Sequence, residues 1–303
     1  MDLNDRMLNA LISCASNYLE KNISLIIPKF DVETLTNVVD SATNLFKNDP
    51  VVLDIPFPVL IVGDLHGSII DIVRILKWAG NPGDLTILFL GDLIDRGDFS
   101  LEVALIVCLL KIKYSSRVYL IRGNHETASV STSFGFLKQI KILTGNSVIF
   151  KKFCALFDQL PLAAIVGQTF FCCHGGIGPK TTKISEIKKV KKPIDESSEI
   201  MTELTWSDPS QYVSTFQSNP RGAGCLFSEQ AVKTFLKEHN LKAIIRAHSF
   251  IDEGVKVEFK QKLYTVFSCS NYCGTRNNQS GVLKVMSSSG LETQTFPSLP
   301  FIK

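Results

Sequence analysis

The chain has 303 residues, which is enough to bury a large hydrophobic core in one or two domains. Its composition, with 45% hydrophobic and 20% charged residues, is typical of a globular protein, and 32 basic against 29 acidic residues leave a net charge of only +3. This balance does not indicate a nucleic-acid or membrane partner, and the longest apolar run, Val103 to Leu110, is too short to cross a bilayer.

The first 48 residues have apolar residues at helical spacing, in one segment around Leu8, Leu11 and Leu19 and in another from Val32 to Phe46. Pro28 separates the two segments. No cluster of ligand-type side chains occurs here. We therefore expect residues 1–48 to be a helical N-terminal segment that packs against the rest of the chain.

The opening residues are acidic and polar, whereas a secretory signal is basic and then apolar. Several of the eight cysteines lie in apolar runs, and none forms a Cys-x-x-Cys pair. This usage indicates buried thiols in a reducing compartment. We expect a protein of the cytoplasm, the nucleus or both.

Between Val59 and Glu126, three apolar runs each end in a glycine-bounded cluster of polar residues: GDLHG at 63–67, GDLIDRG at 91–97 and RGNHE at 122–126. The spacing of about thirty residues is that of a strand–helix–strand unit. The pattern predicts strands over 59–62, 85–90 and 118–121, joined by helices over 68–78 and 100–111. Because ligands bind beyond the carboxyl ends of such strands, we expect the three clusters to face one crevice.

The clusters contain oxygen and nitrogen donors from aspartate, asparagine and histidine, and no cysteine. This mixture suits a divalent metal such as Mn, Fe or Zn. With further histidines downstream, there are enough donors for two metals that share a carboxylate, as in phosphatases and nucleases. Arg96 and Arg122 fit a phosphate oxyanion, which guanidinium groups bind through paired donors.

The rest of the chain alternates between strand-like and helix-like segments. We predict helices over residues 127–144, 148–156 and 228–239, and strands over residues 160–166, 169–173, 241–245, 256–259, 263–267 and 281–286. His174 and His248 each follow a predicted strand, whereas His239 lies at a helix end and is assigned no function. Residues 295–303 are predicted to be a frayed tail. The candidate ligands span residues 64–272, so we expect one folding unit, 1–303.

With GDLHG, GDLIDRG, RGNHE, HGG and RAH in this order, the chain resembles the serine/threonine protein phosphatases of the phosphoprotein phosphatase family, in the type-1/type-2A group, over roughly residues 20–290. LTWSDP, NPRGAG and FSCSNYCG match shorter signatures of that family. The resemblance implies an α+β metallophosphoesterase fold. It is a four-layer α/β/β/α sandwich in which two mixed β-sheets are flanked by helices and a di-metal site lies at the strand ends.

The resemblance also implies a role for each matching residue. The ligands of the first metal would include Asp64 and His66, Asp92 would bridge to the second, and the second would be completed by Asn124, His174 and His248. A metal-bridging water or hydroxide would attack phosphorus directly. His125, held by Asp95, would be the general acid, and the phosphate would be bound by Arg96, Arg221 and Tyr272. The expected cofactors are two divalent ions, Mn in vitro and Fe or Zn in the cell.

The expected substrates are phosphoserine and phosphothreonine proteins, and the resemblance implies separate regulatory or scaffold subunits. The chain departs from the family in the loop after Gly274, where Thr275-Arg276-Asn277 replaces the usual acidic and aromatic residues. We expect Arg276 to favour acidic phosphopeptides. In the region that aligns with the type-1 docking groove for regulatory subunits, Val257 stands where an aromatic residue is usual.

Three alternatives stay open. The chain could be another metallophosphoesterase, such as a dinucleoside-polyphosphate hydrolase or a nuclease. It could be a catalytically inactive scaffold, although none of the matched ligands is missing. Arg122 and Glu126 could be salt-bridged scaffold that holds Asn124 and His125 rather than catalytic residues, and this is the reading that we favour.

Overall fold

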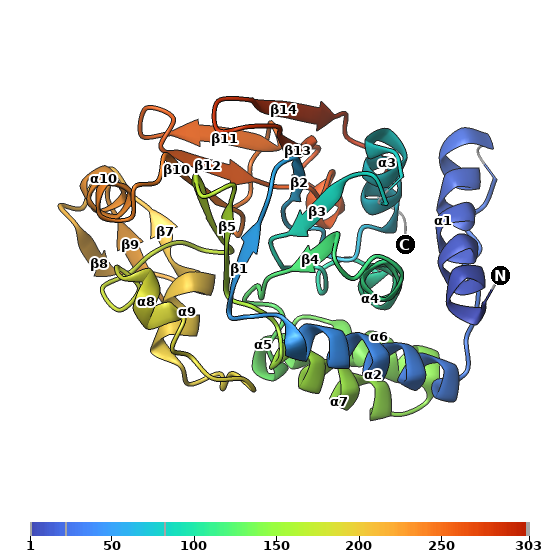
Figure 1. Cartoon of the computed structure of the whole chain (residues 1–303). Coiled ribbons are helices and arrows are strands. Elements are labelled where there is room, and N and C mark those ends of the chain that lie inside the picture. Colours follow the sequence, from blue (N-terminus) through green and yellow to red (C-terminus); the bar gives the residue numbers. More distant parts are fainter. Residues whose placement is uncertain (1, 22, 82, 301–303) are drawn as a thin grey trace.

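The computed structural model describes residues 2–21, 23–81 and 83–300 (Figure 1). Two sheets pack face to face, and helices cover the outer face of each. The five-stranded sheet has the order β14-β13-β2-β3-β4 and the six-stranded sheet the order β1-β5-β6-β10-β12-β11. The predicted sandwich of two mixed sheets flanked by helices is confirmed.

Three parallel strands of the five-stranded sheet carry the motif clusters. β2 (Val59–Val62), β3 (Thr86–Phe89) and β4 (Val118–Leu120) are consecutive neighbours in the sheet. The connecting helices are α3 (Ile69–Ala79) and α4 (Ser100–Lys113). These bounds agree with the predicted strand–helix–strand units within a few residues, because fully buried strands and an amphipathic α3 leave an unambiguous apolar pattern. Two antiparallel strands complete this sheet: β13 (Ser280–Val285) and β14 (Leu291–Phe296).

The six-stranded sheet brings the second half of the chain alongside. The predicted hairpin is present as β5 (Ala163–Val166) and β6 (Phe170–Cys173), and β6 lies parallel to β10 (Ala243–Arg246). The remaining strands are β1 (Val52–Ile55), β11 (Val255–Glu258) and β12 (Leu263–Val266). Since β6 and β10 are parallel neighbours, their carboxyl ends deliver the residues that follow them to the same edge.

Three large hydrophobic clusters among the described residues correspond to the spaces between layers, and a small fourth one surrounds Phe267. Side chains of both sheets meet in the middle, among them Ile61, Leu88, Phe170 and Ile245. The outer face of the five-stranded sheet packs against α1 (Leu3–Lys21), α2 (Val32–Asn48), α3, α4, α6 (Phe136–Thr144) and α7 (Val148–Phe157). The other outer face packs against α8 (Ile184–Ile187), α9 (Glu199–Trp206) and α10 (Glu229–Glu238). Figure 1 shows α1 and α2 at the outer side of these layers.

The secondary structure between residues 127 and 227 differs from the sequence-based predictions. The helix predicted over 127–144 is divided into α5 (Ala128–Ser133) and α6, because Phe134 leaves the helix and Gly135 has a φ of +131°. A small third sheet was not anticipated; its strands are β7 (Asp208–Pro209), β8 (Phe216–Ser218) and β9 (Cys225–Phe227).

The frayed tail predicted from residue 295 is wrong for residues 295–300. β14 continues to Phe296, whose backbone pairs with β13. The Arg74 guanidinium donates to the Pro297 carbonyl at 2.7 Å, and Leu299 packs against the core. Residues 301–303 lie outside the described part of the chain. Among the described residues, no helix is both long and apolar enough to span a membrane.

Candidate active site

The polar clusters meet at one edge of the sandwich. Asp64, Asp92 and Asn124 follow β2, β3 and β4 of one sheet, and His174 and His248 follow β6 and β10 of the other. All five residues are buried. An isolated bridge between Asp64 and Phe267 joins the two sheets at this edge. The sheets therefore bring together side chains that lie as far as 184 positions apart in the chain, such as Asp64 and His248, whose amide donates to the Asp64 carboxylate at 2.9 Å.

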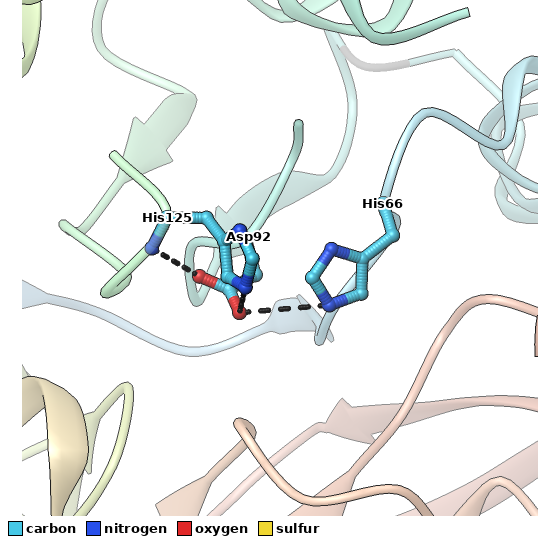
Figure 2. A group of neighbouring side chains, drawn as sticks. All are labelled: His66, Asp92 and His125. Carbon is cyan, nitrogen blue, oxygen red and sulfur yellow. Dashed lines mark hydrogen bonds and ion pairs between the residues drawn. The ribbon is translucent and has the colours of Figure 1, made fainter. Parts of the chain in front are cut away.

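One group of potential metal donors consists of His66, Asp92 and His125 (Figure 2). The Asp92 Oδ2 atom lies 3.6 Å from His66 Nε2 and 4.0 Å from His125 Nε2. His66 Nε2 is also 3.7 Å from Asp64 Oδ2. The predicted ligand pair Asp64 and His66 therefore lies in contact. His125, predicted to be a general acid and not a ligand, approaches Asp92 Oδ2, the same atom that faces His66 Nε2.

A second group consists of Asp92, His174 and His248. Here the other carboxylate oxygen, Asp92 Oδ1, lies 3.3 Å from His174 Nε2. Asn124 Oδ1 is 2.9 Å from His248 Nδ1 and 3.1 Å from His174 Nε2. Asp92 is thus the member common to both groups, with one oxygen toward each, as a bridging carboxylate requires.

Backbone carbonyls orient two of the histidines. His66 Nδ1 lies 2.9 Å from the Ile94 carbonyl and His174 Nδ1 lies 2.8 Å from the Leu90 carbonyl. When Nδ1 donates to a carbonyl, Nε2 of the neutral ring carries the lone pair, and this second contact is the usual way in which proteins orient a metal-binding histidine. Burial, with a further contribution from His125, lowers the pKa of His66 to about 3, which keeps its ring neutral.

The charges of the site fit divalent cations. Burial, reinforced by the Asp92 carboxylate, raises the pKa of Asp64 to about 7. Burial opposes protonation of His174, but the Asp92 carboxylate outweighs it and raises the pKa of His174 to about 9. In both cases, buried carboxylate charge attracts a positive charge, and a divalent cation would supply it. The donor set of carboxylate, amide and imidazole is also the set that such metals prefer.

The glycines of the motifs allow the loops to approach each other. A Cβ atom on Gly123 would lie 2.4 Å from the backbone nitrogen of Asp92, and one on Gly91 would lie 2.3 Å from the nitrogen of Gly123. The Glu126 carboxylate secures this contact by accepting from the amides of Asp92, Leu93 and Gly123 at 2.8–3.0 Å. The close approach sets the position of Asp92, whose own φ is +53°.

His125 and Asp95 form a buried pair. His125 Nδ1 lies 2.7 Å from Asp95 Oδ2, and the other oxygen of Asp95 accepts from the Phe136 amide at 2.8 Å. Burial disfavours the charged ring, but the carboxylates of Asp92 and Asp95 outweigh it and raise the pKa of His125. The imidazole is therefore held in a fixed orientation and favoured in its protonated form, as proton donation requires.

The residues predicted to bind phosphate lie around this centre. Arg96 is exposed, and its guanidinium carbon lies 4.1 Å above the Phe134 ring. The Arg221 side chain is 43% exposed, and its Nε donates to Asp208 at 2.6 Å. The Tyr272 ring lies 5.2 Å from the ring of His66. Within residues 2–21, 23–81 and 83–300, no hydrogen bond uses the Arg96 guanidinium or the two terminal nitrogens of Arg221, so these donors are available at the surface.

Asp208 is a residue whose role the sequence did not reveal. One of its oxygens accepts from Arg221, and the other accepts from the buried Arg246 at 3.1 Å and from Ser249 at 2.9 Å. Burial opposes ionisation, yet the charges of Arg246, His248 and Arg221 hold the pKa of Asp208 below its usual range. The turn that contains Asp208 is visible in the sequence, but nothing local indicates which arginines its carboxylate will face.

The calcineurin-like phosphoesterase family model matches residues 57–252, a span that includes every donor described above. The chain belongs to this family. A solved serine/threonine phosphatase from Saccharomyces cerevisiae, described as similar to human phosphatase PP5, is 28% identical with a TM-score of 0.83, over 94% of this chain and 95% of that chain. A cold-active protein-tyrosine phosphatase of a psychrophilic Shewanella species is 14% identical with a TM-score of 0.55, over 82% of this chain and 83% of that chain, and shows the fold alone.

In this phosphoesterase, Arg122 is scaffold and not a phosphate ligand. It is fully buried, and it donates to the backbone carbonyls of Glu126 and Ile194 at 2.9 and 2.7 Å and to Asp158 at 2.9 Å. The interpretation of Arg122 as a phosphate-binding residue is therefore wrong, and its salt bridge to Asp158 agrees with the scaffold alternative. Glu126 also supports the loops, but its carboxylate does so by accepting from backbone amides and not through a salt bridge. Arg122 uses its donors to hold the loop that carries Asn124 and His125.

Substituting Arg122 by alanine is expected to lower the free energy of unfolding by about 3 kcal/mol, because buried carbonyls lose their donors and a cavity forms. Urea unfolding followed by circular dichroism measures this change. Arg6→Ala, at an exposed position of α1, is the matched control. A loss for Arg122→Ala no larger than that of the control would contradict the scaffold role.

Proposed function

We propose that this phosphoesterase is a metal-dependent serine/threonine protein phosphatase. The observation that carries the proposal is the position of Asp92, with one carboxylate oxygen toward each donor group, beside the His125–Asp95 pair. The likeness to the yeast serine/threonine phosphatase over almost the whole of both chains supports the same substrate class.

The first metal would be held by Asp64, His66 and Asp92, and the second by Asp92, Asn124, His174 and His248. When bound, two divalent cations lower the pKa of a water molecule and neutralise phosphate charge. Mn is the metal that we would supply in vitro, and Fe or Zn would serve in the cell. Asp92 would be shared by the two metals, and the carbonyls of Ile94 and Leu90 fix the ring orientations of His66 and His174, which would bind them.

The other polar residues act on the phosphate and on the leaving group. Arg96 and Arg221 reach the surface and would bind the phosphate oxygens, and Tyr272, which shares a pocket lining with Arg96, would assist them. Asp208 orients Arg221 through a 2.6 Å contact. His125 would donate its proton to the departing seryl or threonyl oxygen while Asp95 holds the ring. An alkoxide is a poor leaving group, so a positioned acid is most valuable for this type of ester.

The test of the proposal is hydrolysis of phosphorylated peptides by protein that has been stripped with a chelator and then supplied with Mn²⁺. Phosphoserine and phosphothreonine peptides should be hydrolysed only after Mn²⁺ is restored. A preference for dinucleoside polyphosphates would instead indicate a dinucleoside-polyphosphate hydrolase. No hydrolysis of any phosphoester, with metal bound, would favour the inactive scaffold.

Substituting Arg276 is expected to change the preference among phosphopeptides. The guanidinium of Arg276 is exposed, and its carbon lies 5.4 Å from the Phe250 ring centre, close to Tyr272, which stacks on the same ring. With Arg276→Ala, kcat/KM for acidic phosphopeptides should fall about threefold relative to basic ones, as for a surface charge. An unchanged ratio of acidic to basic turnover would disprove this role.

We also propose that separate regulatory or scaffold subunits direct the enzyme in the cytoplasm or nucleus. All eight cysteines are free thiols, as a reducing compartment permits. Cell fractionation tests the proposed location, and the native mass of the endogenous complex tests the proposed subunits.

Val257, at the position where a docking aromatic is usual, is 47% exposed on the edge strand β11.

A further inference from the structure

A groove of about 700 Å³ lies on the helical side of the molecule, apart from the metal donors. Its walls come from α1, from the segment between α1 and α2, from the start of α4 and from α6. Most of the lining is apolar, and it includes Leu11, Phe30, Leu35, Leu105, Ile142 and Leu143. The volume is within the range of specific ligand sites. None of the residues of the two metal-donor groups lines this groove, and Arg96 is the one residue of the catalytic proposal that does.

One buried side chain in the groove carries a carboxylate oxygen without a hydrogen-bond partner among the described residues. Glu102, in the first turn of α4, lines the groove and is only 5% exposed. Its Oε2 atom is buried and has no hydrogen-bond partner among the described residues. Burial raises the pKa of the Glu102 carboxyl to about 7. A buried carboxylate without a partner is costly, so the site favours a ligand that brings a hydrogen-bonding cation.

The rim of the groove is apolar and exposed. Ile142 is 73% exposed, Leu143 is 49% exposed and Phe134 is 42% exposed. Large apolar side chains gathered at the mouth of a groove are typical of a surface that a protein partner covers. Two lysines, Lys29 and Lys138, are exposed among the lining residues and are available to acidic groups of that partner.

We propose that this groove is a docking site for a polypeptide segment of a partner protein, in which apolar residues flank one lysine or arginine that pairs with Glu102. The apolar side chains of the segment cover Ile142 and Leu143. Its basic side chain reaches the floor of the groove, where the carboxylate lacks a partner. A free amphiphilic amine would meet the floor but would leave the exposed rim largely uncovered, which is why a polypeptide fits better.

The groove also adjoins the active site. Arg96 and Phe134 are among its lining residues, and the Phe134 ring lies 5.4 Å from the ring of His125. A segment in the groove therefore lies next to residues that the proposed reaction uses. Docking here would hold the partner, or a substrate attached to it, close to the catalytic centre, which raises its effective concentration there.

The test begins with a random 12-residue peptide library displayed on phage and selected on the full-length protein supplied with Mn²⁺. Selected peptides should carry apolar residues around one lysine or arginine. Isothermal titration should then show at least tenfold weaker binding to Glu102→Gln, and equally weak binding when the basic residue of the peptide is replaced by norleucine. The two changes combined should weaken binding little more than either alone, because they remove the same contact.

Glu238→Gln, on the exposed side of α10, is the matched control and should bind the peptides like the wild type. Ile142→Asp should also weaken binding at least tenfold. Because Ile142 is exposed, this loss of binding would not result from unfolding of the protein. The proposal is overturned if no peptides are selected, if the selected peptides lack a basic residue, or if they bind Glu102→Gln as tightly as the wild type. Because binding is the readout, these outcomes are independent of whether the protein hydrolyses phosphoesters.

Discussion

Substituting Asp92 by asparagine is expected to lower kcat/KM for a phosphoserine peptide by about 10³-fold, since the variant loses the charge that both metal positions share. The Asp92 oxygens lie 3.6 Å from His66 Nε2 and 3.3 Å from His174 Nε2, so one substitution affects both donor groups. Asparagine has the same shape, and it offers one oxygen where the bridging position needs two. Activity with restored Mn²⁺, together with the metal content of the purified variant, measures the effect.

Asp54→Asn is the matched control, because Asp54 is exposed on β1 and outside both donor groups. It should retain wild-type activity and metal content. If Asp92→Asn were as active as this control, the proposed metal centre would be wrong. If it bound metal normally and lost activity, Asp92 would act on the reaction without bridging the metals.

The second large effect is expected at His125, and it should depend on the leaving group. With His125→Asn, kcat/KM for a phosphoserine peptide should fall by about 10²–10⁴-fold, the usual contribution of a general acid. Hydrolysis of p-nitrophenyl phosphate should fall much less, since nitrophenolate departs without a proton. Asp95→Asn should show the same selectivity in weaker form, because asparagine lacks the negative charge that favours the protonated His125 ring across the 2.7 Å contact.

His239→Asn is the control, since His239 ends α10, contacts the Thr182 carbonyl and belongs to neither donor group. Equal losses on both substrates for His125→Asn would contradict the acid role. They would indicate instead that His125, which lies 4.0 Å from Asp92 Oδ2 and belongs to the first donor group, helps to hold a metal.

Much of the catalytic half of the fold follows from local sequence. The runs before Gly63, Gly91 and Arg122 are short and apolar, and helical spacing follows the first two clusters, so strand, loop and helix could each be located without knowledge of the rest. The glycines carry information of the same local kind. Gly91 and Gly123 mark loops that approach more closely than any side chain allows, and this is why the clusters have a recognisable form.

Features that depend on distant contacts could not be predicted in this way. The break at Gly135 and the pairing of β14 with β13 overturned predictions made from local pattern alone. Asp208 gains its role only because folding brings Arg221 and Arg246 to its two oxygens. Arg122 looks like a phosphate ligand in sequence, and only its burial among carbonyl acceptors shows that it is scaffold.

Local sequence is sufficient to identify the donor types, the strand–loop–helix units and the residues at strand ends, since backbone preference and hydrophobic periodicity act over a few residues. The packing of distant segments selects which strand ends meet and makes Asp92 common to both donor groups. It also buries Glu102 in the lining of a groove, where its Oε2 atom has no hydrogen-bond partner in the part of the chain that the structure describes. The physical reason is that burial and charge compensation depend on the packing of two sheets and their helices. The sequence of one segment therefore does not determine which distant residues it will contact.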